Sequence, residues 1–148
     1  MSVCAFTGHR VLVDLDVALM DRVIRNLIKS GCKRFLCGMA QGFDLAAAES
    51  VLAFRRQFPE IELVACVPCE GQSSYFSATD KERYDRVLKN SSEVIMLAGK
   101  YYQGCMQARD RFMVDNCDLV VCYLRKSSGG TYYTVRYATA LGKKIIEL

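Results

Sequence analysis

Histidine, long apolar runs and an excess of one charge are all scarce in this sequence of 148 residues. His9 is its one histidine, so a mixed cysteine–histidine metal site has few ligands to draw on, and we expect no metal. No stretch of about 18 uninterrupted apolar residues occurs, so we expect neither a membrane span nor a membrane partner. The formal net charge of +4 permits a nucleic acid or a phosphorylated small molecule as partner and requires neither.

An export signal is also missing from the start of the sequence. Residues 1–10 have neither a basic start nor a long apolar run, and they read as a strand. The eight cysteines lie mostly in apolar, strand-like runs, so we expect a reduced, cytoplasmic protein rather than a disulfide scaffold. Cys66 and Cys69 have the spacing of a redox motif, but a reactive thiol needs a helix N-terminus beside it, and the segment EGQSSYF that follows reads as a loop.

Apolar runs typical of buried strands alternate along the chain with segments of helical periodicity. The runs are continuously apolar, as expected when helices cover both faces of a parallel sheet. The length suits one domain spanning residues 1–148. The pattern predicts a doubly wound, Rossmann-like α/β domain with a mostly parallel sheet of about six strands and helices on both faces. The predicted strands are 2–8, 33–38, 61–67, 93–98, 118–124 and 143–148, and the predicted helices are 15–30, 45–52, 79–90, 106–116 and 131–141.

Polar residues predict where two of these helices begin. Asp14 precedes the first helical segment and is its predicted N-cap. Thr79 and Glu82 have the spacing of a capping box. We therefore expect helices that start directly after Asp14 and at Thr79.

The candidate ligand site lies outside the carboxyl ends of the strands, where such sheets bind their ligands. The first loop there reads Thr7-Gly8-His9-Arg10. It offers a hydroxyl, a glycine that a ligand can approach closely, and two side chains with hydrogen-bond donors. These groups suit an anionic or polar ligand, and the alternative is a polar turn with a surface arginine.

The second loop, CGMAQGFD, places Gly38 and Gly42 before an alanine-rich helix. Glycines permit a tight turn and exposed N–H groups at a helix N-terminus, where anions are favoured. The loop lacks the Gly-Lys-Ser/Thr ending of a P-loop, and TGHRVLVD after the first strand lacks the glycine spacing of a dinucleotide fingerprint. Asp44 fits two roles, as a helix N-cap or as a ligand contact that accepts a hydrogen bond from a ribose or a base.

The last loop, RKSSGGT, is the most phosphate-like segment of the sequence. Ser128, Gly129, Gly130 and Thr131 combine small residues, exposed N–H groups and a hydroxyl before a helix, although a flexible turn is the alternative. Two arginines precede the fifth strand and could clamp a phosphate, and four tyrosines could stack on a base. A charged outer helix face and core packing are the alternatives. These residues are Arg109, Arg111, Tyr101, Tyr102, Tyr132 and Tyr133.

Four segments in order resemble the SLOG superfamily, which joins DprA-like DNA-processing proteins with LOG-like nucleotide hydrolases. They are AFTGHR, CGMAQGFDLAAAE, RDRFMVDNCD and SSGGTYYTVRYA, and they span nearly the whole chain. The strongest likeness is to the YpsA-like branch of small bacterial proteins. The resemblance implies a Rossmann-like fold with a pocket for a nucleotide or nucleotide-derived ligand, in a sensor or regulator. Carried over by position, that pocket uses Thr7, Gly8, His9, Arg10, Gly38, Gly42, Asp44, Gly129, Gly130 and Thr131, with Arg109 or Arg111 nearby.

One departure from the family bears on enzymatic activity. LOG-like phosphoribohydrolases resemble this chain at the Gly-Thr pair but carry a glutamate three residues later, where Thr134 stands here. Asp44 and His9 are then the remaining acid–base candidates for a hydrolase that cleaves an N-glycosidic or phosphate bond. A third interpretation is single-stranded DNA binding, as in DprA-like proteins, although this chain shows no strong basic cluster. Related domains often pair, so we also expect a homo-oligomer.

Overall fold

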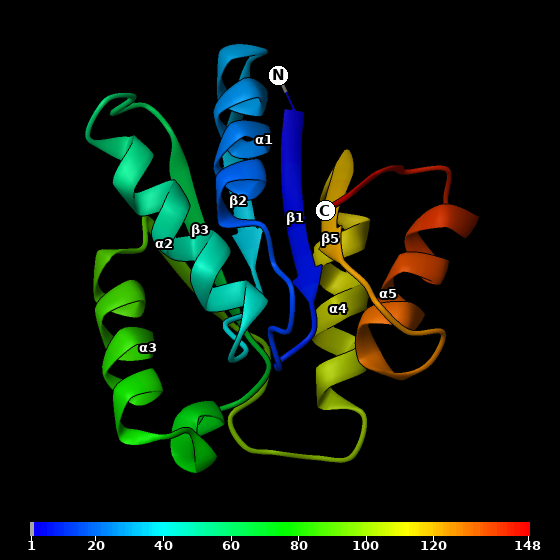
Figure 1. Cartoon of the computed structure of the whole chain (residues 1–148). Helices are drawn as coiled ribbons and strands as arrows, with labels where there is room; N and C mark the ends of the chain where they lie inside the picture. The colour runs from blue at the N-terminus through cyan, green and yellow to red at the C-terminus, as the bar shows by residue number, and fades with distance from the viewer. Residues whose placement is uncertain (1) are drawn as a thin grey trace.

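The computed structural model describes residues 2–148, which form a six-stranded sheet with helices packed on both of its faces (Figure 1). The strands are β1 Ser2–Gly8, β2 Cys32–Cys37, β3 Glu62–Val67, β4 Glu93–Met96, β5 Leu119–Tyr123 and β6 Lys144–Glu147. The helices are α1 Val17–Lys29, α2 Phe43–Arg55, α3 Ala78–Asn90, α4 Cys105–Asp115 and α5 Gly129–Ala140, with a short 3-10 helix, η1, at Gln72–Tyr75. Within residues 2–148, no helix combines the length and the apolar character needed to cross a membrane.

The sheet is parallel throughout, with the strand order β4-β3-β2-β1-β5-β6. The chain steps outward from β1 to β4 and then returns to place β5 beside β1. The carboxyl ends of these two central strands therefore lie next to each other, with Thr7 opposite Cys122 and Gly8 opposite Tyr123. This arrangement confirms the predicted Rossmann-like fold and creates the switch point at which such sheets bind ligands.

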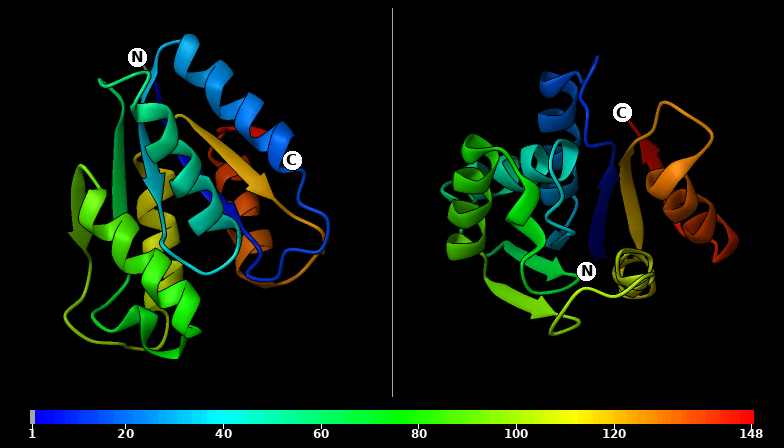
Figure 2. Two further views of the ribbon diagram at one scale, coloured as in Figure 1. Left: turned by 60° about the vertical axis from the view of Figure 1, so that its left-hand side comes forward. Right: turned by 90° about the horizontal axis from the view of Figure 1, so that it is seen from below.

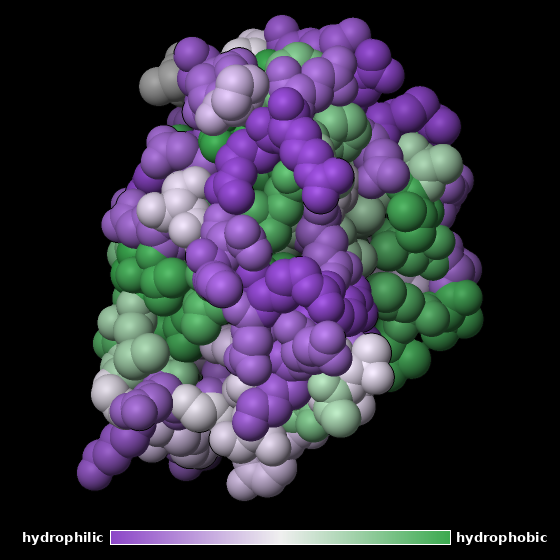
Figure 3. All heavy atoms as spheres, turned by 90° about the vertical axis from the view of Figure 1, so that its left-hand side faces the viewer, coloured by the Kyte–Doolittle hydropathy of each residue, from purple (hydrophilic) through white to green (hydrophobic). Residues whose placement is uncertain are grey.

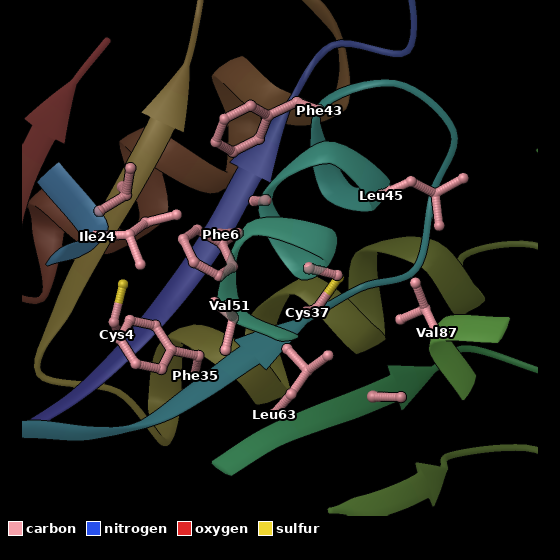
Figure 4. Close-up of a cluster of buried hydrophobic side chains, with 14 of the residues drawn as sticks. Cys4, Phe6, Ile24, Phe35, Cys37, Phe43, Leu45, Val51, Leu63 and Val87 are labelled. Carbon is pink, nitrogen blue, oxygen red and sulfur yellow. The ribbon is translucent and has the colours of Figure 1, made fainter. Parts of the chain in front are cut away.

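Two apolar clusters hold the helices against the sheet. Helices α1, α2 and α3 lie on one face of the sheet, and α4 and α5 lie on the other (Figure 2). One cluster includes residues of α1, α2 and α3, and the other includes residues of α4 and α5. In the first, Phe6 of β1 stacks on Phe35 of β2 with ring centroids 5.8 Å apart, and Phe43 of α2 meets Phe6 edge-on at 6.1 Å (Figure 4). Such aromatic contacts fix the start of α2 above the end of β1.

The residues that cap two of the helices differ from those predicted. The N-cap of α1 is Asp16, whose carboxylate accepts from the Leu19 N–H at 3.0 Å, and Asp14 lies outside the helix. The N-cap of α3 is Ser77, whose hydroxyl accepts from the Asp80 N–H at 3.2 Å, so the capping box predicted at Thr79 does not form. Each segment offers more than one residue with capping chemistry, and tertiary contacts decide which one is used.

Candidate functional site

A cleft of about 1150 Å³ lies at the carboxyl ends of β1 and β5. This volume lies slightly above the range of about 300–1,000 Å³ that is usual for small-molecule sites. Segments that are far apart in the sequence meet there: the loop after β1, the start of α2, the segment after β3, α4, and the entry to α5. Among the predicted ligand residues, the cleft is lined by Thr7, Gly8, His9, Arg10, Asp44, Arg109, Gly129, Gly130 and Thr131, and it is not lined by Gly38, Gly42, Arg111 or Ser128.

The glycines before α2 serve contacts between protein segments. A Cβ at Gly8 would overlap the Phe43 side chain, and a Cβ at Gly42 would overlap the carbonyl oxygen of Arg10. Gly42 also has a φ of 79°, which side chains strongly disfavour. The first N–H of α2, at Phe43, donates to the His9 carbonyl at 3.1 Å. The glycines thus let the loop after β1 lie directly on the start of α2.

Asp44 is the most unusual side chain of the cleft. It is 5% exposed, and its Oδ2 accepts from the Ala40 N–H at 3.2 Å. Its Oδ1 is the only fully buried side-chain oxygen or nitrogen within residues 2–148 that has no hydrogen-bond partner. Burial raises the pKa of Asp44 to about 7, against the opposing effects of the Arg109 guanidinium and the Ala40 N–H. A buried polar atom without a partner is costly, which favours a ligand that supplies one.

Asp44 does not act as the N-cap of α2. That position belongs to Gly42, and α2 has no side-chain cap. Asp44 lies in the first turn of the helix, where its carboxylate faces back to the loop residue Ala40. Of the two roles that the sequence offered, helix cap or ligand contact, the geometry does not support the cap, and Asp44 Oδ1 has no hydrogen-bond partner within residues 2–148.

Arg109 reaches the cleft from α4 and holds the loop before α2. Its guanidinium donates to the carbonyl oxygen of Gly38 and to Asp110 Oδ1, the latter at 2.7 Å. A Cβ at Gly38 would lie 2.8 Å from the Arg109 guanidinium carbon. Gln72 donates to the same Gly38 carbonyl at 2.9 Å. Arg109 therefore uses some of its N–H donors for hydrogen bonds within the protein, although it also lines the cleft.

His9 connects the two central loops. Its Nε2 accepts from the Arg125 backbone N–H at 2.8 Å. Burial, followed by the positive charges of Lys126 and Arg125, lowers the pKa of His9. A neutral ring that accepts at Nε2 carries its proton at Nδ1. Its accepting nitrogen is occupied by the backbone, so His9 fits a positioning role better than that of a general base.

Tyr123, at the end of β5, forms hydrogen bonds with the loop that follows β1. Its hydroxyl accepts from the N–H groups of Val13 and Asp14 and donates to Asp14 Oδ1 at 2.8 Å. Arg125 pairs with the same carboxylate at 3.0 Å and lies over the Tyr123 ring at 4.4 Å. The Tyr123 hydroxyl, more than Arg125, lowers the pKa of Asp14. Sequence reasoning missed this group because it read Tyr123 as an apolar strand residue and Asp14 as a helix cap.

The entry to α5 forms the opposite side of the cleft. α5 begins at Gly129, two residues earlier than predicted, and its N-cap Ser128 makes no capping hydrogen bond. A Cβ at Gly130 would meet no atom within 4 Å, and one at Gly129 would meet only the end of Lys126. Gly129, Gly130 and Thr131 line the cleft, and protein atoms leave the space beside Gly130 unfilled. The first N–H groups of a helix have no partner within the helix.

Arg111 and Thr134 lie apart from the cleft lining. Arg111 is exposed on α4 and donates to the Tyr133 hydroxyl at 3.0 Å. The Thr134 hydroxyl donates to the Gly130 carbonyl one turn earlier, at 2.8 Å. The Thr134 hydroxyl is therefore hydrogen-bonded within α5. LOG-like hydrolases carry a glutamate at this position, and Thr134 supplies no carboxylate there.

The cysteines of this chain are all free and buried. Burial raises the pKa of Cys66 to about 12, and burial followed by the neighbouring Cys105 raises the pKa of Cys69. Thiols with raised pKa values are poor nucleophiles at neutral pH, which argues against a redox role for the Cys66–Cys69 pair.

Comparison with known proteins places the chain among related sequences. The family model YpsA, described as the YspA SLOG family, matches residues 3–145. The SPbeta prophage-derived protein YoqJ of Bacillus subtilis is 30% identical over 141 residues, which cover 85% of this chain and 82% of that protein.

Two solved structures share the fold. DNA processing protein A (DprA) of Helicobacter pylori, whose structure concerns a single-stranded DNA binding mode, aligns with a TM-score of 0.74 at 20% identity. DprA of Streptococcus pneumoniae aligns with a TM-score of 0.72 at 19% identity. Each alignment covers 99% of this chain, but the chain spans only 64% and 50% of the two DprA chains. The fold is shared with DprA, and the matched sequence shows that this chain belongs to the YpsA SLOG family.

Proposed function

We propose that the cleft binds a nucleotide or nucleotide-derived ligand, with an anionic group on the N-terminus of α5 and a sugar or base against Asp44. One observation carries this proposal: a single cleft contains both an uncapped helix N-terminus and a buried carboxyl oxygen without a partner. An anion alone would suit the first group, and a hydrogen-bond donor alone would suit the second. A phosphorylated nucleoside combines an anionic phosphate with hydrogen-bond donors on its sugar or base.

The anionic end is supported by charge as well as by geometry. The N–H groups at a helix N-terminus carry partial positive charge, and Gly129 and Gly130 leave room for a phosphate to approach them. Lys126 and Arg10 also line the cleft, and neither forms an ion pair with a carboxylate within residues 2–148. Both cations are therefore available to a phosphate.

The Asp44 end selects for a hydrogen-bond donor. An ionised Asp44 accepts a hydrogen bond from a ribose hydroxyl or a base amino group, which supplies the partner that Oδ1 lacks. Because the pKa of Asp44 is about 7, its protonated form also exists near neutral pH and donates instead. We expect binding of a donor ligand to strengthen as the pH rises through 7 and Asp44 ionises.

A thermal-shift panel tests the proposal directly. Nucleoside mono-, di- and triphosphates, ADP-ribose and nicotinamide dinucleotides are added to the folded protein, and the best ligand is titrated by calorimetry. We expect at least one of them to raise the melting temperature, and Asp44→Ala to abolish most of the shift. Glu60→Gln, which changes an exposed carboxylate, is the matched control and should bind as the unmodified chain does. A well-folded protein that no member of the panel stabilises would contradict the proposal.

Hydrolysis of such a ligand is the second candidate function, and the pKa of Asp44 favours it. A carboxyl group with a pKa of about 7 is matched to general acid–base work at neutral pH. Incubation of the panel ligands with the protein, followed by chromatography, decides between binding and turnover. Products that appear with the unmodified chain and vanish with Asp44→Asn support an enzyme, whereas unchanged ligands support a binding protein.

Single-stranded DNA is the third candidate, and the aromatic rim of the cleft favours it. Tyr75, which is 97% exposed, and Tyr101 line the cleft together with Arg10 and Lys126. Exposed rings and cations are the groups on which single-stranded nucleic acids stack and pair. Gel shifts with oligonucleotides should then show binding that weakens steeply as salt rises. No complex at low salt would remove this candidate.

A further inference from the structure

The two edges of the sheet differ in how they are protected. The edge strand β6 carries charges at both ends, Lys144 and Glu147, next to Lys143. At the other edge, nothing in the described chain lies beyond β4 (Figure 2). On the side of the molecule that carries α3, apolar areas of the surface lie beside a hydrophilic band (Figure 3). Edge strands usually carry lysine, proline or a bulge that prevents pairing with another chain.

Between Glu93 and Leu97 the β4 edge has no lysine, proline or bulge, and its remaining protection is its short length of four residues. Val94 is 45% exposed and Met96 is 51% exposed, and both side chains lie on the same face of the sheet because residues two apart share a face. Glu93 is the only charge of the segment, and it already pairs with Arg34 of the same chain at 2.9 Å. The edge therefore presents apolar side chains and no unpaired charge.

The backbone of β4 has a defined outward register. The Leu97 N–H donates to the Val67 carbonyl of β3 at 2.9 Å, so the backbone at Leu97 faces inward. Backbone groups alternate in direction along a strand, so those of Val94 and Met96 point away from β3. Two outward donors and two outward acceptors thus stand at this edge without a partner strand.

This edge is complementary to itself under a two-fold rotation. When two copies of β4 run antiparallel about an axis at Ile95, Val94 of one copy lies opposite Met96 of the other, and every outward N–H meets an outward carbonyl. The same operation brings the two exposed apolar side chains of one copy against those of the second. Shifting the register by two residues would lose half of these hydrogen bonds.

We propose that a second copy of this chain docks on β4, antiparallel across a two-fold axis at Ile95, so that the two sheets join into one. The proposal is independent of the ligand of the cleft, because β4 residues do not line it. Self-complementarity favours a second copy over an unrelated strand, since closed two-fold pairs are the commonest homo-oligomers. The absence of an unpaired charge on the segment removes the repulsion that would oppose such pairing.

Cysteine cross-linking tests the register. In this arrangement the Ile95 residues of the two copies form a non-hydrogen-bonded pair with Cα atoms about 4.5 Å apart, within disulfide range. Ile95→Cys should therefore give a disulfide-linked dimer under mild oxidation. Val94→Cys is the matched control: Val94 is offset from its symmetry mate, so it should cross-link much less even though the site is well exposed. Equal cross-linking of the two variants, or none with Ile95→Cys, would overturn the register.

Sedimentation velocity tests the association itself. The unmodified chain should sediment as a dimer at high concentration, and Met96→Lys should weaken dimerisation by more than about tenfold, because symmetry introduces the charge twice. Leu141→Lys changes a side chain of similar exposure, 49%, far from β4 in the sheet order, and should leave the dimer intact. Circular dichroism checks that each variant is folded. A monomer at every concentration, or a dimer that Met96→Lys leaves unchanged, would overturn the proposal.

Discussion

The cleft has two glycine-containing sides that read alike in sequence and differ in structure. Before α2, the spaces beside Gly8, Gly38 and Gly42 are filled by Phe43, by Arg109 and by the Arg10 carbonyl. Before α5, the space beside Gly130 contains no atom within 4 Å. Glycines of the first kind allow protein segments to touch, whereas those of the second kind leave room for a ligand. The α2 side of the cleft is therefore built from contacts between protein segments, and the α5 side is the proposed anion seat.

The largest expected effect separates these two kinds of glycine by stability. Gly42→Ala should lower the free energy of unfolding by about 2–4 kcal/mol, because it combines a positive φ with an overlap on the Arg10 carbonyl. Gly130→Ala should change it by less than about 1 kcal/mol, since the site is unfilled and no positive φ is needed. Urea denaturation measures both. Similar losses of unfolding free energy for the two variants would contradict the distinction between glycines that allow protein contacts and glycines that leave room for a ligand.

A second prediction concerns the buried carboxyl group of Asp44, on the α2 side of the cleft. The pKa of Asp44 is raised by folding to about 7 from an ordinary value of 3.8, so its contribution to stability is present at low pH and is lost as the pH rises through 7. Between pH 5 and pH 8, the unmodified chain should lose about 2–3 kcal/mol relative to Asp44→Asn, which cannot ionise.

Denaturation curves of both proteins at the two pH values measure this difference. Glu60→Gln, at an exposed carboxylate, is the control and should follow the unmodified chain at both. A constant offset between the unmodified chain and Asp44→Asn would mean that Asp44 titrates normally and has no special place in the cleft.

Most of the architecture follows from local patterns, and the site does so only in part. The strands were predictable because each contains a run of apolar residues, which is uninterrupted in LVVCY of β5. The starts of α1 and α3 were displaced to Asp16 and Ser77, because several nearby residues have capping chemistry and the sequence pattern does not rank them. His9, Asp44 and Gly130, which the sequence placed at the carboxyl edge of the sheet, line one cleft.

The roles of individual side chains were harder to predict, because they depend on contacts across the sheet. The sequence pattern places Tyr123 in the core, yet its hydroxyl donates a hydrogen bond to Asp14, which is 109 residues away in the sequence. Arg109 reads as a phosphate clamp, yet it holds the Gly38 carbonyl. The unpartnered Oδ1 of Asp44 results from burial by several segments. Charge, hydroxyl and glycine content therefore indicate a site, whereas the pairing of its groups appears only in three dimensions.

The smallest expected effect concerns the anion seat alone. Thr131→Val removes a hydroxyl from the cleft and should weaken binding of a phosphorylated ligand by about 10-fold, the lower value of a hydrogen bond to a charged group. Stability should hardly change, because the Thr131 hydroxyl makes no hydrogen bond to another group within residues 2–148. Calorimetric titration of the unmodified chain and the variant with the same ligand measures the ratio. A large loss of stability would show instead that Thr131 supports the fold.

The most direct test of the central claim follows backbone amide resonances by nuclear magnetic resonance during titration with the nucleotides that stabilise the protein. If the cleft is the binding site, the amides of Gly129, Gly130 and Thr131 should shift first and most, together with those around Asp44, while amides of β4 and β6 should stay in place. Shifts confined to other surfaces, or no shifts at the entry to α5 with a ligand that clearly binds, would contradict the account.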